Sequence, residues 1–285
     1  MITISLTRYK ESNALLFQTL DSLSLQENID AEVLVLDQFY DKQTELYCDT
    51  LSNNTISFRY RTIEAKNLCY ARNEAIKLCK TAILLYIDSD AIAHKSWAFF
   101  LKQTLQKDNV GVAWWKIIPL YQNKPLFISK YGRVQSLYSL LDLWSDEFIS
   151  NKVVWANFWV NIDTIGRWIY FDEKFARRKW MLISWDENDF VKKVKDLGFT
   201  IMYNWKAIVH HQILIERISY FWIWKRMYYQ WYSKYISESK PVVTWFSKEK
   251  KWIIYFLFLG LFSMAWLLWY LQWFFQWLNN KVTNK

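Results

Sequence analysis

Short apolar runs alternate with stretches of helical periodicity over the first 121 residues, and this alternation constrains the fold more than any other feature of the chain. The runs at residues 31–37 and 82–88 are apolar along almost their whole length. Strands of that kind are buried on both faces, as in parallel sheets covered by helices. The sequence therefore predicts an α/β fold with a mainly parallel sheet flanked by helices. The expected strands are residues 2–6, 31–37, 56–63, 82–88, 110–121, 199–203 and 207–210, and the expected helices are residues 11–26, 42–51, 68–80, 96–107 and 186–197.

Acidic side chains stand where two of the expected strands end. Asp37 closes the first apolar run, and Asp88 and Asp90 close the second in the order Asp-Ser-Asp. Ligands of parallel α/β sheets bind beyond the carboxyl ends of the strands, and two carboxylates at this spacing can reach one divalent cation. The pattern indicates a Mg²⁺ or Mn²⁺ site, although such a pair also occurs in ordinary turns. Asp37 by itself is more typical of a helix cap or a turn.

Basic and imidazole groups stand close to the same expected edge of the sheet. Arg72 falls on the helix that precedes the Asp88 strand, where a guanidinium can bind a diphosphate through two hydrogen bonds. A plain surface arginine is the alternative. His210 and His211 end a short expected strand, and one of them is either a further metal ligand or a hydrogen-bonded core histidine.

Acidic residues fill the first turn of the expected helix 186–197, namely Asp186, Glu187 and Asp189. A carboxylate beside an acceptor hydroxyl can act as a general base. Acidic residues in a first turn also stabilise the helix dipole, with Asp186 as the N-cap, so a purely structural role is a strong alternative.

The order of these segments along the chain resembles the family 2 glycosyltransferases, whose GT-A fold is Rossmann-like. The resemblance covers about residues 1–212. The segments that carry it are TRYKE (7–11), VLVLD (33–37), AKNLCYARNEAI (65–76), ILLYIDSDA (83–91), IGRWIYFDEKF (165–175), WDENDFVKKVKDLGF (185–199) and AIVHH (207–211).

The resemblance implies a role for each candidate residue. It implies a divalent cation, Mn²⁺ or Mg²⁺, held most directly by Asp90, and a late histidine ligand that matches His211 better than His210. The family's Glu-Asp pair before the acceptor-side helix matches Asp186-Glu187 here, so Glu187 takes the place of the usual base. The residues implied to bind the nucleotide sugar are Thr7, Arg8, Glu11, Asp37, Arg72, Asn73 and Asp88, of which Asp88 also binds the metal.

The reaction implied by the resemblance is direct displacement with inversion at the anomeric carbon. The base takes the proton of an acceptor hydroxyl, and the metal stabilises the leaving nucleoside diphosphate. We expect a hexosyltransferase-like enzyme that uses a nucleotide sugar, with a UDP-sugar favoured as donor. The expected acceptor is a glycan or a lipid-linked saccharide, in the synthesis of a cell-surface or envelope polysaccharide.

Other classes of protein fit the sequence less well. A non-catalytic, membrane-bound module that binds nucleotide sugars is the main alternative, because the Asp186-Glu187 order departs from the family pattern. A processive polysaccharide synthase would carry a Gln-x-x-Arg-Trp signature, which is absent. A sugar nucleotidyltransferase would need a glycine-rich loop near Thr7. Nucleic-acid binding is not expected, since the basic residues are dispersed and no nucleic-acid motif is present.

The composition changes in the last 70 residues of the chain. Residues 252–278 contain no charged side chain. This uncharged segment of 27 residues is longer than the roughly 20 residues needed to cross a bilayer. Lysines flank this segment, and their bias places the catalytic domain on the cytoplasmic side of a membrane. The expected domains are residues 1–215 (a nucleotide-binding half, 1–107, and an acceptor half, 108–215), an amphipathic juxtamembrane segment, 216–247, and a transmembrane helix with a short tail, 248–285.

Tryptophan is unusually common and glycine unusually rare. The chain has 19 Trp and 5 Gly, whereas average usage gives roughly 20 glycines for this length. Several tryptophans stand where the family usually has a small residue, and three more are spaced by four in the apolar segment. We expect many of them to be glycine in the native protein, through a UGA codon that its source translates as glycine. The alternative is a Trp-rich protein with membrane-interface belts. The positions are Trp114, Trp115, Trp155, Trp159 and Trp185, followed by Trp269, Trp273 and Trp277.

Overall fold

The computed structural model describes residues 1–143, 148–149, 159–176, 182–183 and 185–238. The chain divides into two compact units, residues 1–234 and 235–285. The predicted transmembrane segment, 252–278, lies outside the described residues, as do Trp155, Trp269, Trp273 and Trp277. Within the described ranges no helix is both long and apolar enough to cross a bilayer.

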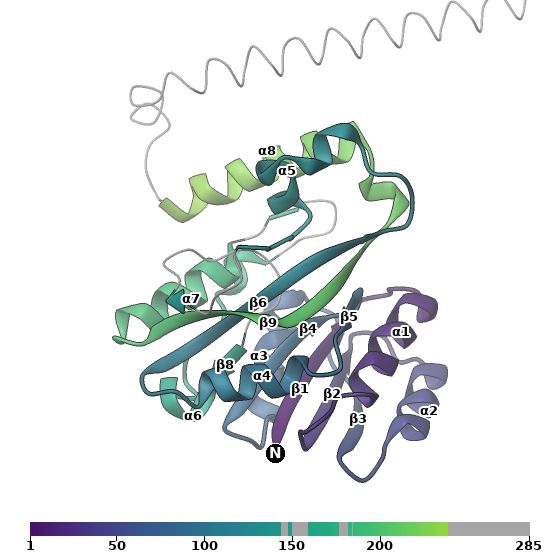
Figure 1. The fold of residues 1–285 in the computed structure, drawn as a ribbon, viewed down its shortest axis with the longest axis vertical. Helices are drawn as coiled ribbons and strands as arrows, with labels where there is room; N and C mark the ends of the chain where they lie inside the picture. The colour runs from purple at the N-terminus through teal and green to yellow at the C-terminus, as the bar shows by residue number, and fades with distance from the viewer. Residues whose placement is uncertain (144–147, 150–158, 177–181, 184, 239–285) are drawn as a thin grey trace, which may run out of the picture. The chain divides into compact units, whose positions relative to one another are not determined.

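A nine-stranded mixed sheet forms the centre of the described part of the first unit (Figure 1). Its order is β3-β2-β1-β4-β8-β6-β9-β5, with β7 paired to β9. Strands β1 to β4 are parallel to one another, whereas β8 is antiparallel to both β4 and β6. The prediction of a mainly parallel α/β sheet is confirmed. The strands are β1 (Ile2–Arg8), β2 (Ala31–Asp37), β3 (Ile56–Thr62), β4 (Ile83–Asp88), β5 (Ala91–Ala93), β6 (Val110–Tyr121), β7 (Phe148–Ile149), β8 (Trp159–Asn161) and β9 (Thr200–Ile213).

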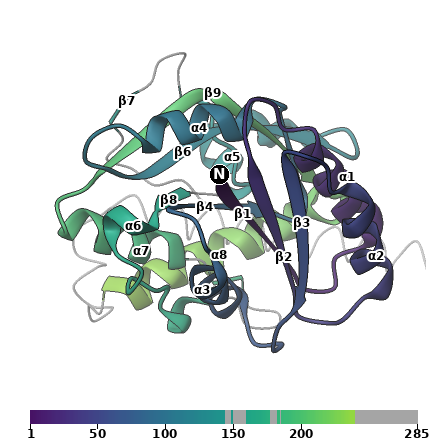
Figure 2. The ribbon, with the colours of Figure 1, turned by 90° about the horizontal axis from the view of Figure 1, so that it is seen from below.

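Helices cover both faces of the sheet. Figure 2 shows α1 and α2 together on one side of β1 to β3, and α3 on the other side. This arrangement follows from right-handed strand–helix–strand crossovers that run first outward from β1 and then back to β4. The helices are α1 (Asn13–Ser24), α2 (Lys42–Leu51), α3 (Leu68–Leu78), α4 (Trp97–Leu105), α5 (Gly132–Leu137), α6 (Ile162–Ile165), α7 (Asp186–Asp196) and α8 (Tyr220–Glu238), with 3-10 turns η1 (Phe127–Lys130), η2 (Glu173–Phe175) and η3 (Ile215–Arg217).

The central strands are buried on both faces, as their continuous apolar sequence predicts. Val33, Leu34, Val35 and Leu36 of β2 are all 0% exposed. Burying each such side chain contributes about 1.5–3 kcal/mol relative to leaving it in water. This burial fixes the positions of the polar residues that follow the carboxyl ends of these strands, along one edge of the sheet.

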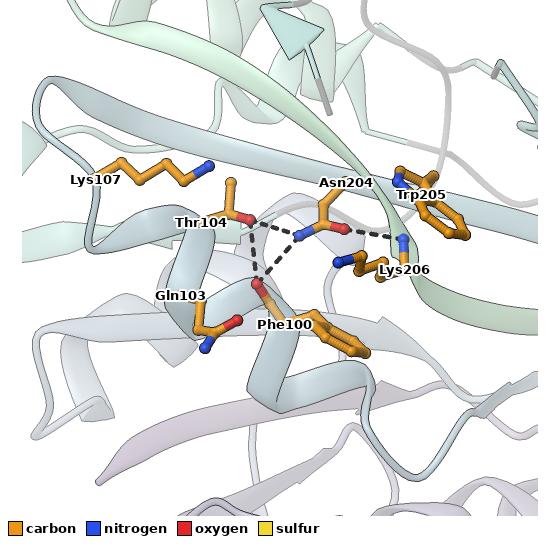
Figure 3. A pocket seen from close by; sticks show the side chains of 7 residues that line it. All are labelled: Phe100, Gln103, Thr104, Lys107, Asn204, Trp205 and Lys206. Atoms are coloured by element: carbon orange, nitrogen blue, oxygen red, sulfur yellow. Dashed lines mark hydrogen bonds between the residues drawn. The ribbon is translucent and has the colours of Figure 1, made fainter. Parts of the chain in front are cut away.

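Strand β9 is one continuous strand, whereas the sequence suggests two short ones at 199–203 and 207–210. The polar residues 204–206 lie at a bulge in β9. The bulge is marked by a shift in the register with β6 between Trp115 and Lys116. Asn204 turns its side chain inward there, and its amide donates to Thr104 Oγ1 at 2.8 Å and accepts from the Lys206 N–H at 2.9 Å (Figure 3). The prediction of two separate strands was wrong, since β9 runs through the bulge and the Asn204 side chain accepts from the Lys206 N–H there.

Three tryptophans meet in the core between α4, β6 and β8. The rings of Trp97, Trp115 and Trp159 make edge-to-face contacts with centroids 4.9–5.5 Å apart. Their indole N–H groups are buried and have no hydrogen-bond acceptor among the described residues. An unsatisfied buried donor costs about 1–3 kcal/mol. The packing is therefore costlier than a smaller residue at Trp115 or Trp159 would require.

Backbone conformation gives no separate reason for glycine at the suspect positions. Among the described non-glycine residues, positive φ angles occur at Lys10, Asn28, Asn109 and Ser139, and at none of the tryptophans. Glycine at Trp114, Trp115, Trp159 or Trp185 thus stays a prediction; the unsatisfied N–H groups favour it at Trp115 and Trp159, and φ favours it at none of the four.

Candidate active site

Arg72 connects two helices and a strand at the carboxyl edge of the sheet. Its Nη1 lies 2.6 Å from Asp186 Oδ2 and 2.8 Å from Glu187 Oε1, both in the first turn of α7. Its Nη2 lies 3.9 Å from Asp88 Oδ1, at the end of β4. The guanidinium, Asp186 and Glu187 are almost fully buried, whereas the Asp88 side chain is partly exposed. The site residues expected at separate places in the sequence are brought together here.

Charge pairing sets the protonation of this cluster. Burial alone would raise the pKa of Glu187, but the Arg72 guanidinium outweighs it and lowers this pKa to about 2. The same carboxylates raise the pKa of Arg72 against the effect of its burial. Glu187 is therefore ionised at any pH near neutrality. Its second oxygen, Oε2, is buried and has no hydrogen-bond partner among the described residues.

Helix α7 is held against the sheet by a close approach at Gly111 of β6. A Cβ at Gly111 would lie 2.7 Å from Cγ1 of Val194, so the helix could not pack as it does against any larger residue. The N-cap position belongs to Trp185, which makes no side-chain cap hydrogen bond. The suggestion that Asp186 is the N-cap was wrong, because its carboxylate turns to Arg72 instead.

Asn73 binds backbone and lies next to the cluster. Its amide nitrogen donates to Phe171 O at 3.1 Å, and its oxygen accepts from Phe171 N at 2.8 Å. The Phe171 ring stacks on Phe190 of α7 and lies 5.5 Å from the Arg72 guanidinium carbon. Asn73 thus fixes the segment that covers Arg72. Its expected support of a diphosphate stays a prediction.

Asp90 and His211 lie side by side on β-paired segments. Ala91 pairs with His211 in the sheet, and Asp90 Oδ1 is 3.4 Å from His211 Nε2. His211 Nδ1 lies 2.8 Å from the carbonyl oxygen of Tyr138, which can only accept, so Nδ1 carries the proton. In the neutral ring Nε2 then carries the lone pair, and it lies beside Asp90. His210 directly precedes His211 in β9 and points to the opposite face of the sheet.

These two side chains fit a divalent cation. A neutral imidazole whose other nitrogen is fixed by a carbonyl, beside a carboxylate, is a common ligand pair. Within the described residues no group of three or more His, Cys, Asp or Glu side chains is close enough to hold a metal ion. The remaining ligands would have to be water and phosphate oxygens, as is usual for Mg²⁺.

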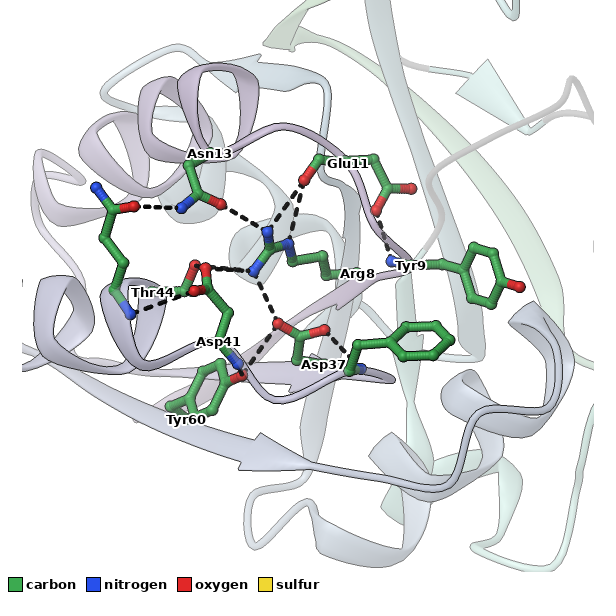
Figure 4. A network of polar contacts seen from close by, with 10 residues as sticks. Arg8, Tyr9, Glu11, Asn13, Asp37, Asp41, Thr44 and Tyr60 are labelled. Atoms are coloured by element: carbon green, nitrogen blue, oxygen red, sulfur yellow. Dashed lines mark hydrogen bonds and ion pairs between the residues drawn. The ribbon is translucent and has the colours of Figure 1, made fainter.

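Three of the residues expected around the nucleotide, Arg8, Glu11 and Asp37, lie in one tightly bonded network (Figure 4). Arg8 Nη1 lies 2.9 Å from Asp37 Oδ2 and 2.8 Å from Asp41 Oδ2. Asp37 is 0% exposed and also accepts from the Tyr60 hydroxyl. In this structure Arg8 and Asp37 therefore bond to each other and hold the loops after β1 and β2. Their expected contact with the nucleotide stays a prediction.

Thr7 and Glu11 lie nearer to the carboxylates of β4. Thr7 pairs with Asp88 in the parallel ladder. Burial raises the pKa of Glu11 against the hydrogen bond from the Tyr9 N–H, and the charges of Asp90 and Asp88 add to the increase. Glu11 is thus close enough to Asp88 and Asp90 for their negative charges to act on it.

Sequence reasoning missed three residues at this edge. Tyr9 and Phe39 are exposed just beyond β1 and β2, with ring centroids 5.3 Å apart. The Lys10 ammonium lies 4.2 Å from the centre of the Phe39 ring. An exposed aromatic pair with a cation offers a stacking surface for a base and a charge for a phosphate. The signal available in the sequence was the position of these residues directly after the two strands.

The family model of glycosyl transferase family 2 matches residues 4–179, more than half of the chain. The chain therefore belongs to glycosyl transferase family 2. A comparison with curated proteins gave no match.

Solved structures with the same fold are glycosyltransferases of low sequence identity. GalNAc-T7, solved with UDP, GalNAc and Mn²⁺, has a TM-score of 0.56 at 13% identity, over 74% of this chain and 43% of that chain. The mannosyltransferase PcManGT from Pyrobaculum calidifontis, with GDP-Man and Mn²⁺, has a TM-score of 0.52 at 14% identity, over 73% and 56%. S. aureus TarS 1-349, with UDP-GlcNAc, has a TM-score of 0.52 at 17% identity, over 74% and 58%. The chain spans about half the length of these structures.

Proposed function

We propose that this protein transfers one sugar from a nucleoside diphosphate sugar to an acceptor hydroxyl, with inversion at the anomeric carbon. The observation that carries the proposal is the Arg72 cluster, which places Glu187 beside the carboxyl end of β4. In a parallel α/β sheet this is the edge where ligands bind. A buried, ionised carboxylate at that edge, with one oxygen paired to Arg72 and the other without a partner among the described residues, supports a role on a substrate.

Glu187 serves as the general base. Its unpartnered Oε2 accepts a hydrogen bond from the acceptor hydroxyl. Because its pKa is about 2, it is a weak base before the reaction begins. It takes the proton as the hydroxyl oxygen bonds to the anomeric carbon, when that proton becomes strongly acidic. The bond to the donor diphosphate breaks on the opposite face of the sugar, which gives inversion.

Asp90 and His211 would hold a Mn²⁺ or Mg²⁺ ion, with Asp88 beside it. When bound, such an ion neutralises charge that develops on the leaving diphosphate. The named ligands of the similar structures, UDP with GalNAc and Mn²⁺, GDP-Man with Mn²⁺ and UDP-GlcNAc, support a metal-dependent nucleotide-sugar donor. We favour a UDP-sugar, whose base would stack on Tyr9 and Phe39.

Membrane attachment is part of the proposal, with the catalytic domain on the cytoplasmic side. Helix α8 exposes Phe221, Trp224 and Tyr228, which we name the aromatic face. Their rings stack along the helix, with centroids 6.2 and 6.3 Å apart. Aromatic side chains of this kind favour the interface between lipid and water. The face supports a membrane-bound enzyme that builds a surface or envelope glycan on a lipid-linked acceptor.

A donor-hydrolysis and transfer screen with purified full-length protein tests the proposal. Nucleotide sugars are offered with and without Mn²⁺, and Glu187→Gln and Asp90→Ala are the variants. We expect metal-dependent release of one nucleoside diphosphate, lost in both variants, while Glu187→Gln still binds the donor. Donor binding without release in the unaltered protein would instead support a non-catalytic binding module.

A further inference from the structure

Arg217 bridges the two side chains that fit a metal ion. Its Nη2 lies 3.0 Å from Asp90 Oδ2, and its Nη1 lies 3.2 Å from His211 Nε2. Arg217 closes η3, the short turn between β9 and α8. No motif in the sequence singles out Arg217, which follows His211 by six residues.

The hydrogen-bond chemistry makes Arg217 a substitute for a cation. A guanidinium has donors only, and His211 Nδ1 already carries its proton, so the Nε2 lone pair accepts from Arg217. Asp90 meets the other guanidinium nitrogen through a charge-assisted hydrogen bond. The guanidinium therefore uses the nitrogen lone pair and a carboxylate oxygen that would coordinate a metal.

We propose that Arg217 is an internal counter-cation of the metal site, which must leave Asp90 and His211 before both can coordinate a divalent ion. This inference rests on the proposed metal role of those two residues. A guanidinium and a divalent cation repel each other and compete for the same atoms. Arg217 thus weakens the binding of bare metal. An anionic diphosphate offers the displaced guanidinium a new partner, so donor and metal bind cooperatively.

The ligand pair does not need Arg217 to stay in place. Backbone pairing fixes both residues, since Ala91 pairs with His211 and the Gln212 N–H donates to the Asp90 carbonyl at 2.9 Å. The Arg217 side chain is 29% exposed and lies on a single 3-10 turn, so it can swing toward solvent. Removing its charge should leave the two ligands where they are.

Mn²⁺ binding to the purified full-length protein, followed by electron paramagnetic resonance, tests the proposal without measuring turnover. Losing two charge-assisted hydrogen bonds from the competing cation should tighten the Mn²⁺ Kd of Arg217→Gln about tenfold or more in the absence of nucleotide. Saturating UDP should narrow this difference. Arg61 is exposed on β3, and Arg61→Gln removes the same charge away from the site. This control should stay within about twofold of the unaltered protein, because exposed charges are screened by salt.

Asp90→Ala separates the possible failures. If Asp90→Ala abolishes Mn²⁺ binding but Arg217→Gln binds no more tightly than the unaltered protein, Arg217 is not a competitor and the proposal is wrong. If the tightening is the same with and without UDP, the coupling to donor is wrong. If Asp90→Ala binds Mn²⁺ normally, the metal assignment itself fails, and the inference with it. Thermal melts confirm that each variant is folded.

Discussion

Arg72 and Glu187 are 115 positions apart in the sequence, yet Nη1 of the first lies 2.8 Å from Oε1 of the second. The contact joins α3, in the predicted nucleotide-binding half, to α7, in the predicted acceptor half. One buried ion pair therefore positions the proposed base and connects the two halves of the domain.

Removing the Arg72 charge should destabilise the protein strongly. Arg72→Met leaves Asp186 and Glu187 buried without their cation, which typically costs about 3–5 kcal/mol. Urea unfolding measures the loss. Lys77→Met, on the exposed side of the same helix and paired with Glu74, should change stability by less than about 1 kcal/mol. Equal effects of the two variants would contradict the role given to Arg72.

Glu187→Gln should abolish transfer while it preserves the fold. The amide keeps the size of the side chain but cannot take a proton, and a general base contributes about 10²–10⁴-fold in rate. Single-turnover assays with saturating donor measure the effect. Asp189→Asn, in the same first turn and paired with Lys193, is the matched control and should keep most of the activity. Unimpaired turnover by Glu187→Gln would assign the base to another group.

The stability of the protein should fall in acid because of Glu187. Its pKa is lowered in the folded state, from an ordinary value of 4.5 to about 2. A carboxylate whose pKa is lowered by folding stabilises the folded state at any pH above its pKa in the unfolded chain. This contribution is lost as the pH falls from about 4.5 to about 2. Melting temperatures of the unaltered protein and of Glu187→Gln should converge over that window. Curves that stay parallel throughout would contradict the lowered pKa.

Protein from its native source should carry glycine at Trp114, Trp115 and Trp159. The unsatisfied indole N–H groups of Trp115 and Trp159 show that a smaller residue would relieve a cost in the core. Peptide sequencing by mass spectrometry identifies the residues, and the gene shows whether the codons are UGA. Trp97 has the same unsatisfied N–H but does not stand at a glycine-like position, and it should be read as tryptophan. The prediction would be refuted if the native protein carried tryptophan at positions 114, 115 and 159 as well as at 97.

The aromatic face of α8 should dock on lipid. Hydrogen exchange of residues 220–234 in the full chain should slow when anionic vesicles are present. Substituting Phe221, Trp224 and Tyr228 with alanine should remove the slowing, because each buried aromatic contributes about 1.5–3 kcal/mol. Helix α2 serves as the internal control and should exchange at the same rate with and without vesicles. Unchanged exchange in α8 would contradict the docking.

Local patterns in the sequence determined the elements and the edge of the sheet where the site lies. Helix α2 and strands β2 and β6 have the bounds that periodicity predicts, because burial of a regular element imposes a repeat on neighbouring residues. Asp88 and Asp90 could be placed at the ligand edge for the same reason, since a strand's carboxyl end is a local property. The family resemblance then supplied roles for residues whose positions were already known.

Only the tertiary structure decided which charges meet. The sequence shows Arg72, Asp88 and Glu187 as separate groups, and it shows Arg8 and Asp37 as two candidates for the nucleotide. Folding joins Arg8 to Asp37, gathers three carboxylates on Arg72 and brings Arg217 onto Asp90 and His211. Such pairings depend on the relative positions of distant elements and on the dielectric of the space between them, which leave no periodic trace in the chain.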